Sequence, residues 1–376
     1  MNQAVIPDFF RQILDQPVNN LVDQAQEQGK KAIAYTCSYV PQPLLSLDGV
    51  FPIRVRAPGV VGTPMADTYL SSVICSYTRS VLELALEWAF DSLDGWVFAA
   101  SCDHLRRLYD NLDYLNKPAF NHMIDMPHRG GAAAEKWLTE EYKSLGAALA
   151  ESFGVDASPQ ALSRSIKEHN AYLSVMREIS KMRKQDNPPV TGAMFQTLLA
   201  ASTSAPKDMV MDELKALLAR LRESNEGKPY RARVLLAGSH CDDPGYIDVI
   251  EKTGGLVVAE RTCTGSIPAL APIPENDAPY ETLAGQALAN ISCPRMMESF
   301  QARVDEILEA VEEYRADGVV LQTMKFCDTW GVESGPMVQE LRKAGVPILK
   351  LEREYTMSSE GQLQTRIQAF LESMGK

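Results

Sequence analysis

The sequence has none of the features that mark nucleic-acid-binding or membrane-spanning proteins. Its 376 residues carry a formal net charge of −12, and its lysines and arginines form no basic run. This charge balance excludes a nucleic-acid partner. No apolar stretch approaches the length that a bilayer requires, and the first residues, MNQAVIPDFFRQ, lack the basic start and apolar run of a signal peptide. We therefore expect a cytoplasmic protein that does not interact with membranes.

The short motifs of the commonest enzyme classes are missing as well. The sequence contains no GxGxxG, Walker A, GxSxG or HExxH pattern, so nucleotide-binding and hydrolase functions lack support. It does contain seven cysteines, but no CxxC pair of the kind that structural zinc sites usually show. A reducing cytoplasm disfavours disulfides, which leaves metal binding, catalysis or simple burial as the roles of these thiols.

Apolar runs of strand length alternate with helical patterns at both ends of the chain. The expected strands are 31–36, 95–101, 118–123, 233–238, 255–260, 318–323 and 347–352. The middle of the chain is helical, with long helices expected over 159–184 and 207–224. This alternation is typical of parallel sheets covered by helices. We predict an α/β protein in which two similar Rossmann- or flavodoxin-like parallel-sheet domains, 1–155 and 229–376, flank a helical segment, 156–228.

Six of the cysteines fall into two corresponding sets, one in each predicted sheet domain. Each set has a cysteine after a strand and a cysteine near a helix start. Its third cysteine follows a further strand and is itself followed by an aspartate. The first set is Cys37, Cys75 and Cys102, and the second is Cys263, Cys293 and Cys327. Because the loops after parallel strands gather at one edge of a sheet, we expect the four that follow strands, Cys37, Cys102, Cys263 and Cys327, to converge. Cys75 and Cys293 lie near helix starts, where backbone N–H groups and the helix dipole favour a thiolate. Thiolates are the preferred ligands of iron–sulfur clusters, so the pattern favours such a cofactor.

Simpler roles remain open for individual residues. A lone cysteine usually just packs in the core, and zinc is the rival metal for the six. Cys241 has no evident counterpart in the first domain and is interpreted as buried, with His240 beside it too isolated to indicate a ligand pair. A polar loop is the simpler interpretation of His122, Asp125 and His128, and a solvated rim is the simpler one of Glu352, Arg353 and Glu354.

Eight segments occur in an order that is typical of one superfamily. They are YTCSYVPQPLLSLDGVFPIRV (35–55), ICSYTRSVLE (74–83), SCDHLRRLYD (101–110), IDMPHR (124–129), RTCTG (261–265), ISCPR (291–295), DGVVLQTMKFCD (317–328) and GVPILKLEREYTMSSEGQLQTRIQAFLE (345–372). In these segments, and along nearly its whole length, the chain resembles the 2-hydroxyacyl-CoA dehydratases and benzoyl-CoA reductases.

The resemblance implies two linked α/β domains with oxygen-sensitive iron–sulfur chemistry. Either some of the six cysteines would then hold a single [4Fe-4S] cluster, or all six would hold a double-cubane [8Fe-9S] cluster. The resemblance also implies a separate ATP-dependent activator protein that delivers electrons at very low potential. In the dehydratases, one electron converts a thioester carbonyl into a ketyl radical, which expels the neighbouring hydroxyl group, while the protein orients the substrate and excludes water.

The resemblance leaves the branch of the superfamily and the substrate open. One branch pairs two related subunits, whereas another forms homodimers in which six cysteines of one chain hold the double cubane. We expect the iron–sulfur component, a lyase or an oxidoreductase, of a system that reduces or reductively dehydrates a 2-hydroxyacyl-CoA or another small molecule. The alternatives are a subunit of a benzoyl-CoA-reductase-like heteromer, a non-catalytic partner subunit of a dehydratase, and a binding protein whose cysteines are merely buried. No catalytic acid or base is predicted.

Overall fold

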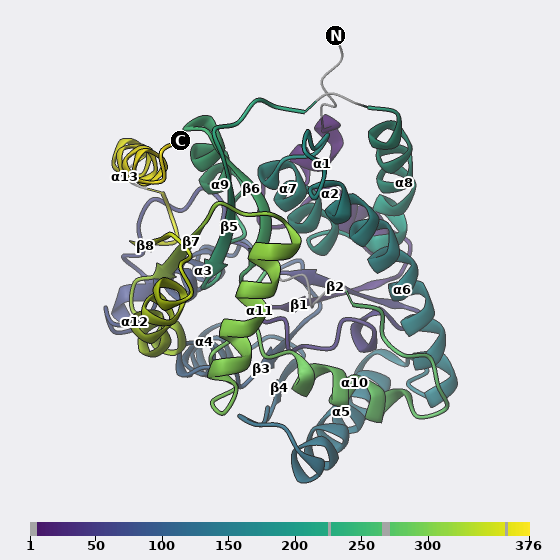
Figure 1. Ribbon diagram of the computed structural model, residues 1–376. Helices are drawn as coiled ribbons and strands as arrows, with labels where there is room; N and C mark the ends of the chain where they lie inside the picture. Colours follow the sequence, from purple (N-terminus) through teal and green to yellow (C-terminus); the bar gives the residue numbers. More distant parts are fainter. Residues whose placement is uncertain (1–5, 225–226, 265–270, 358–359) are drawn as a thin grey trace.

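Two parallel sheets of four strands each form the frame of the molecule (Figure 1). The computed structural model describes residues 6–224, 227–264, 271–357 and 360–376. The strand order is β2-β1-β3-β4 in the first sheet and β6-β5-β7-β8 in the second, so each sheet places its first strand second. The strands are β1 (Lys31–Tyr35), β2 (Val50–Arg54), β3 (Gly95–Ala99), β4 (Asn121–Ile124), β5 (Ala232–Gly238), β6 (Gly255–Arg261), β7 (Gly318–Met324) and β8 (Ile348–Arg353). The predicted α/β class and the likeness of the two sheet domains are confirmed.

Helices cover both faces of each sheet. One face of the first sheet buries α2 (Asn20–Glu27), α3 (Ser76–Leu86) and α4 (Asp103–Leu115), and the other buries α5 (Ala132–Phe153) and α10 (Pro279–Ala289). The faces of the second sheet bury α9 (Pro244–Lys252) with α13 (Glu360–Ser373), and α11 (Phe300–Glu313) with α12 (Asp328–Lys343). Two short 3₁₀ helices are η1 (Leu44–Ser46) and η2 (Ala66–Thr68). None of the helices in the described ranges is both long and apolar enough to cross a membrane.

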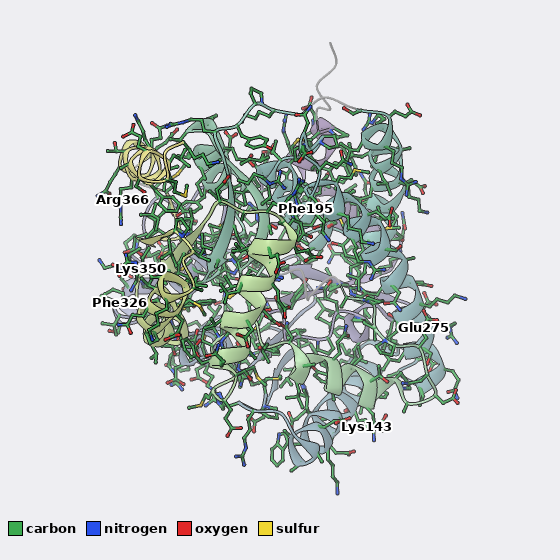
Figure 2. The ribbon with its side chains drawn as sticks, in the orientation of Figure 1. Lys143, Phe195, Glu275, Phe326, Lys350 and Arg366 are labelled. Carbon is green, nitrogen blue, oxygen red and sulfur yellow. The ribbon has the colours of Figure 1, made fainter. Side chains whose placement is uncertain are left out.

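The predicted helical segment between the sheets has a core of its own. It consists of α6 (Pro159–Met182), α7 (Gly192–Thr203) and α8 (Lys207–Glu223), and it also buries α1 (Asp8–Gln12) from the start of the chain. Phe195 of α7 lies inside this core (Figure 2). The Ser158 hydroxyl accepts a hydrogen bond from the Ala161 backbone N–H and so caps α6 at the position expected from the sequence. The predicted domain boundaries at 155 and 228 both fall in loops between elements.

The two halves of the chain interlock through α5 and α10, which lie side by side (Figure 1). Leu283 and Leu288 of α10 are buried in the same core as Leu145 and Leu149 of α5. At the edge of this contact Lys143, labelled in Figure 2, forms an ion pair with a carboxylate of α10. A helix of the second half thus completes the core of the first sheet.

All seven expected strands are present, and one further strand was missed. The missed strand is β2, which contains Pro52. Proline cannot donate a hydrogen bond to a neighbouring strand, so it is tolerated mainly at sheet edges. β2 is an edge strand that pairs only with β1, with Pro52 opposite Ile33.

Candidate functional site

All six predicted ligand cysteines line one cavity of about 110 Å³ between the two sheet domains. Each comes from a loop at the carboxyl edge of a sheet or from a helix start nearby. Cys37 follows β1, and Cys263 follows β6. The N-cap residues of α3, α4 and α12 are Cys75, Cys102 and Cys327. Cys293 lies in the loop before α11. The predicted convergence is confirmed.

The repeated topology changes the correspondence between the two halves. By strand order β1 corresponds to β5 and β2 to β6. The counterpart of Cys37 is therefore Cys241, three residues after β5, and the interpretation of Cys241 as lacking a counterpart was wrong. Cys263 instead follows β6, the counterpart of β2; after β2 the next cysteine is Cys75, the N-cap of α3. Cys241 is 1% exposed and packs in the core of the second sheet away from the cavity, as the sequence indicated.

The thiols of the cavity are held mostly in their neutral form. Burial raises the pKa values of Cys37, Cys75 and Cys102, and it raises that of Cys327 to about 12. A hydrogen bond between Cys263 and Cys293 raises the pKa of Cys263 and lowers that of Cys293 to about 7. Since sulfur binds metals as a thiolate, loading this cavity with a cationic group would release protons.

Hydroxyl groups surround the sulfur atoms. Thr329 Oγ1 lies 3.6 Å from Cys327 Sγ and 4.0 Å from Cys293 Sγ, and Thr78 Oγ1 lies 3.4 Å from Cys75 Sγ. Hydrogen bonds to sulfur are among the features by which a protein sets the reduction potential of an iron–sulfur cluster.

Two buried arginines fix the loops that carry these cysteines. Arg295 Nε donates a hydrogen bond to the carbonyl oxygen of Ser101 at 3.1 Å, and its Nη2 donates to that of Met126 at 2.7 Å, so a residue of the second half orders loops of the first. Arg303 Nη1 donates to the carbonyl oxygen of Cys293 at 3.3 Å. The loop of Cys102 is therefore held by a contact between the two halves, and that of Cys293 by a contact within the second half.

A buried polar network that sequence reasoning missed adjoins the cavity. His240 lines the cavity, stacks on Tyr77 with ring centroids 4.0 Å apart, and lies 3.3 Å from Asp242 Oδ2. Tyr355 donates its hydroxyl proton to the same oxygen at 2.9 Å. Burial alone would raise the pKa of Asp242, but the neighbouring His240 and Arg56 hold that pKa well below its usual range. The available signal was that four of the five residues directly after a buried strand, SHCDD, are polar.

The other polar candidates lie elsewhere. The lining of the cysteine cavity includes none of His122, Asp125 and His128. Glu352 is exposed, so the prediction that it belongs to a solvated rim is correct. The same prediction is wrong for Arg353, which is half-buried. Arg353 Nη2 donates to the carbonyl oxygen of His240 at 2.6 Å, and its Nε donates to Gln322 Oε1 at 2.9 Å. Arg353 thus fixes the loop after β5.

The donor set suits a polynuclear metal cluster. Within the described ranges, no three histidine, cysteine, aspartate or glutamate side chains converge tightly enough to bind one metal ion. The thiols instead surround a volume, whereas structural zinc needs four ligands around one point. All six are free thiols. Thiols are the ligands that iron–sulfur clusters use, so these six cysteines could hold such a group.

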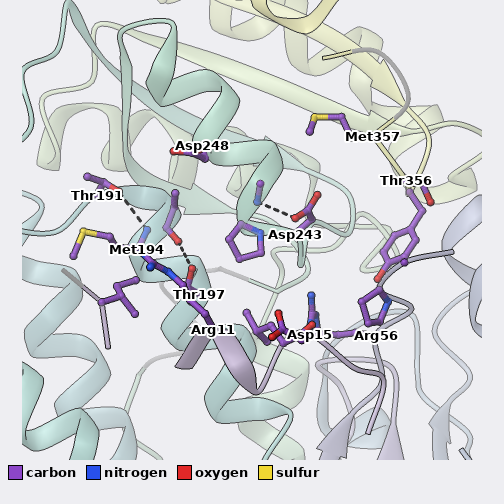
Figure 3. Close-up of a pocket in the computed structure, with 18 of the residues that line it drawn as sticks. Arg11, Asp15, Arg56, Thr191, Met194, Thr197, Asp243, Asp248, Thr356 and Met357 are labelled. Atoms are coloured by element: carbon purple, nitrogen blue, oxygen red, sulfur yellow. Dashed lines mark hydrogen bonds between the residues drawn. The ribbon is translucent and has the colours of Figure 1, made fainter. Parts of the chain in front are cut away.

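Two further cavities lie near the cysteines. One of about 290 Å³ shares Ser38, Tyr39, Arg54 and Asn290 with the cysteine cavity and adjoins it. The other, of about 820 Å³, opens between α1, α7 and the start of α9 and includes no cysteine in its lining (Figure 3).

Comparison with known proteins shows relatives that match nearly the whole chain. The family described as 2-hydroxyglutaryl-CoA dehydratase, D-component, matches residues 37–374. The (R)-phenyllactyl-CoA dehydratase beta subunit of Clostridium sporogenes is 25% identical over 374 residues, which cover 97% of each chain. The beta subunit of (R)-2-hydroxyglutaryl-CoA dehydratase from Acidaminococcus fermentans is 24% identical over 378 residues, or 99% of each chain. A subunit of benzoyl-CoA reductase from Thauera aromatica is 25% identical over 356 residues, which cover 90% of this chain and 88% of the relative. The match includes all six cysteines of the cavity, and the chain belongs to the 2-hydroxyglutaryl-CoA dehydratase D-component family.

Proposed function

We propose that this protein is the iron–sulfur component of an ATP-driven system for low-potential reduction or reductive dehydration of a small substrate. The substrate class that the relatives suggest is a 2-hydroxyacyl-CoA, and electrons would come from a separate ATP-hydrolysing activator protein. The observation that carries the proposal is the meeting of six thiols, three from each half of the chain, around one cavity. The family and the names of the relatives support it.

The protein's own contribution would be to hold the cluster and to position the loops around it. Cys37, Cys75, Cys102, Cys263, Cys293 and Cys327 would be the ligands. A bound iron–sulfur cluster supplies electrons one at a time at low potential. Thr78 and Thr329 place hydroxyls against the sulfurs, and Arg295 and Arg303 hold the loops that carry Cys102 and Cys293.

Anaerobic metal analysis tests the proposal. We expect a brown protein with either about eight iron atoms per chain, for a double cubane that uses all six cysteines, or about four, for a single cluster. Cys102→Ala should lower the iron content, whereas Cys241→Ala, which removes a buried thiol outside the cavity, should not. A colourless protein that binds only zinc under the same conditions would refute the proposal.

A second candidate is a partner subunit that shapes an active site without turning over substrate alone. The observation that favours it is that the dehydratase relatives are beta subunits. Phe326 and Val332, on either side of the start of α12, are 44% and 77% exposed, and Phe326 points outward (Figure 2), so two apolar side chains near Cys327 would be available to a partner. Co-expression with a related subunit and size-exclusion chromatography would distinguish a heterodimer from a homodimer.

A further inference from the structure

The 290 Å³ cavity beside the cysteines is lined mainly by apolar and aromatic side chains. They come from the loop after β1 and from α6, α7 and α10, and they include Val40, Leu173, Phe195, Leu199 and Leu283. No aspartate, glutamate or lysine occurs among the lining residues that the structure describes. The cavity therefore offers mostly apolar surface to a ligand.

The tyrosines of the lining add aromatic rings rather than free hydroxyl groups. Tyr39 donates its hydroxyl proton to the carbonyl oxygen of Asn290 at 2.8 Å, and Tyr142 donates to that of Tyr39 at 3.0 Å. The Tyr172 hydroxyl lies 2.8 Å from Ser202 Oγ. Because each hydroxyl has a partner in the protein, what these tyrosines leave for a ligand is aromatic carbon.

Within the described lining, charge is confined to the end that meets the cysteine cavity. Arg54 lines both cavities. Its Nη1 donates to Ser38 Oγ at 3.0 Å, and its Nη2 donates to the carbonyl oxygen of Cys263 at 3.2 Å, so the fork that would clasp a carboxylate already binds neutral acceptors. Burial and the neighbouring Lys207 hold the pKa of His169 well below its usual range, so this second basic residue of the lining is neutral at pH 7.

We infer that this cavity holds the apolar acyl chain of a 2-hydroxyacyl thioester whose polar end lies toward the cysteines. The residues that line both cavities are Ser38, Tyr39, Arg54 and Asn290, so polar groups mark the junction and apolar groups lie beyond it. The thioester carbonyl and the hydroxyl group of such a substrate lie at the junction, and its side chain fills the apolar part.

The substrate class is therefore a thioester of a 2-hydroxy acid with a branched aliphatic or aromatic side chain. A volume of about 290 Å³ is just below the range of drug-sized pockets, about 300–1,000 Å³, and so suits one such side chain. A second carboxylate at the end of the chain is disfavoured, because it would lose its water without gaining a partner. The inference deepens the proposed function and rests on it, but the preference for an apolar group can be measured without turnover.

Isothermal titration of the full-length protein, purified without oxygen, tests the inference. The probes are N-ethylamides, because thiolates attack a thioester but not an amide. The amide of 2-hydroxy-4-methylpentanoic acid carries the apolar chain, that of lactic acid lacks it, and the C1 amide of malic acid has a carboxylate in place of the isopropyl group. We expect the first to bind at least tenfold more tightly than either of the others, since each buried methylene contributes about fourfold to affinity.

Two substitutions on neighbouring helices provide a matched comparison. Ala287→Leu in α10 adds bulk inside the lining and should weaken binding of the 4-methylpentanoic amide about tenfold or more. Ala148→Leu in α5 makes the same change against the same core but outside the lining, and it should leave the affinity unchanged. The comparison of the three amides uses the wild-type protein, so it decides the question even where Ala287→Leu fails to fold.

Three results would overturn the inference: no binding of the 4-methylpentanoic amide, equal or tighter binding of the lactic or malic amide, or unchanged affinity in folded Ala287→Leu. The iron content of the same samples separates this outcome from that of the proposed function. Selective binding by a protein that holds no iron would leave the apolar site standing and refute the proposed function. An iron-loaded protein without this selectivity would do the reverse.

Discussion

Removal of the Cys327 thiol should reduce the loss of stability that the cluster-free protein suffers at alkaline pH. Burial raises the pKa of Cys327 to about 12, against about 9 in the unfolded chain. Between these values the folded chain keeps its proton while the unfolded chain loses it. Stability therefore falls as the pH rises, by up to about 1.5 kcal/mol between pH 9.0 and 10.5 for this one thiol. In Cys327→Ala that part of the decline should disappear.

Cys241 provides a matched control for this prediction. Burial also raises its pKa to about 12, but it lies outside the cavity. Urea unfolding of metal-free protein at both pH values should show the same reduced decline in Cys241→Ala and Cys327→Ala. Only Cys327→Ala should lose iron after anaerobic loading. An unchanged alkaline decline in both variants would refute the argument from burial, and equal iron contents would refute the assignment of Cys327 as a ligand.

Three further predictions concern residues around the site, each measured by urea unfolding. Gly238→Ala should destabilise the protein by more than about 3 kcal/mol, because Gly238 has φ +124° and an added Cβ would lie 1.7 Å from the Gln322 carbonyl oxygen; wild-type stability would contradict this close approach. Arg183→Met should cost about 3–5 kcal/mol, since it leaves the buried Glu260 carboxylate without its partner, and adding Glu260→Gln should recover part of the loss. Lys207→Met should remove a rise in stability of up to about 2 kcal/mol between pH 7 and 9, because burial lowers the pKa of Lys207 to about 7 and only the unfolded chain keeps its proton over that range; parallel pH profiles of variant and wild type would count against it.

Local patterns in the sequence were sufficient for most of the fold. Buried strands and long amphipathic helices have a periodicity of their own, so their positions could be predicted without knowledge of their neighbours. β2 was missed because its proline is acceptable only at a sheet edge, and edge position is a property of the whole sheet.

The candidate site likewise has some residues that could be predicted from local patterns and others that could not. The convergence of Cys37, Cys102, Cys263 and Cys327 could be predicted because parallel strands bring their following loops to one edge. The roles of His240, Arg54 and Arg353 could not, since each depends on a contact with a residue more than a hundred positions away. No spacing pattern encodes such contacts, which arise only in the folded chain.

The packing of α10 against α5 bears on how such a protein matures on the ribosome. The first sheet lacks part of its core until the segment around Leu283 and Leu288 has been synthesised and has folded back. The last sulfur of the cavity, that of Cys327, emerges later still. A nascent chain therefore exposes Cys37, Cys75 and Cys102 for much of its synthesis without being able to enclose a cofactor. Under the proposed function, a cluster that uses thiols of both halves would be enclosed only after Cys327 has been synthesised, and protection of the earlier thiols until then would come from outside the protein.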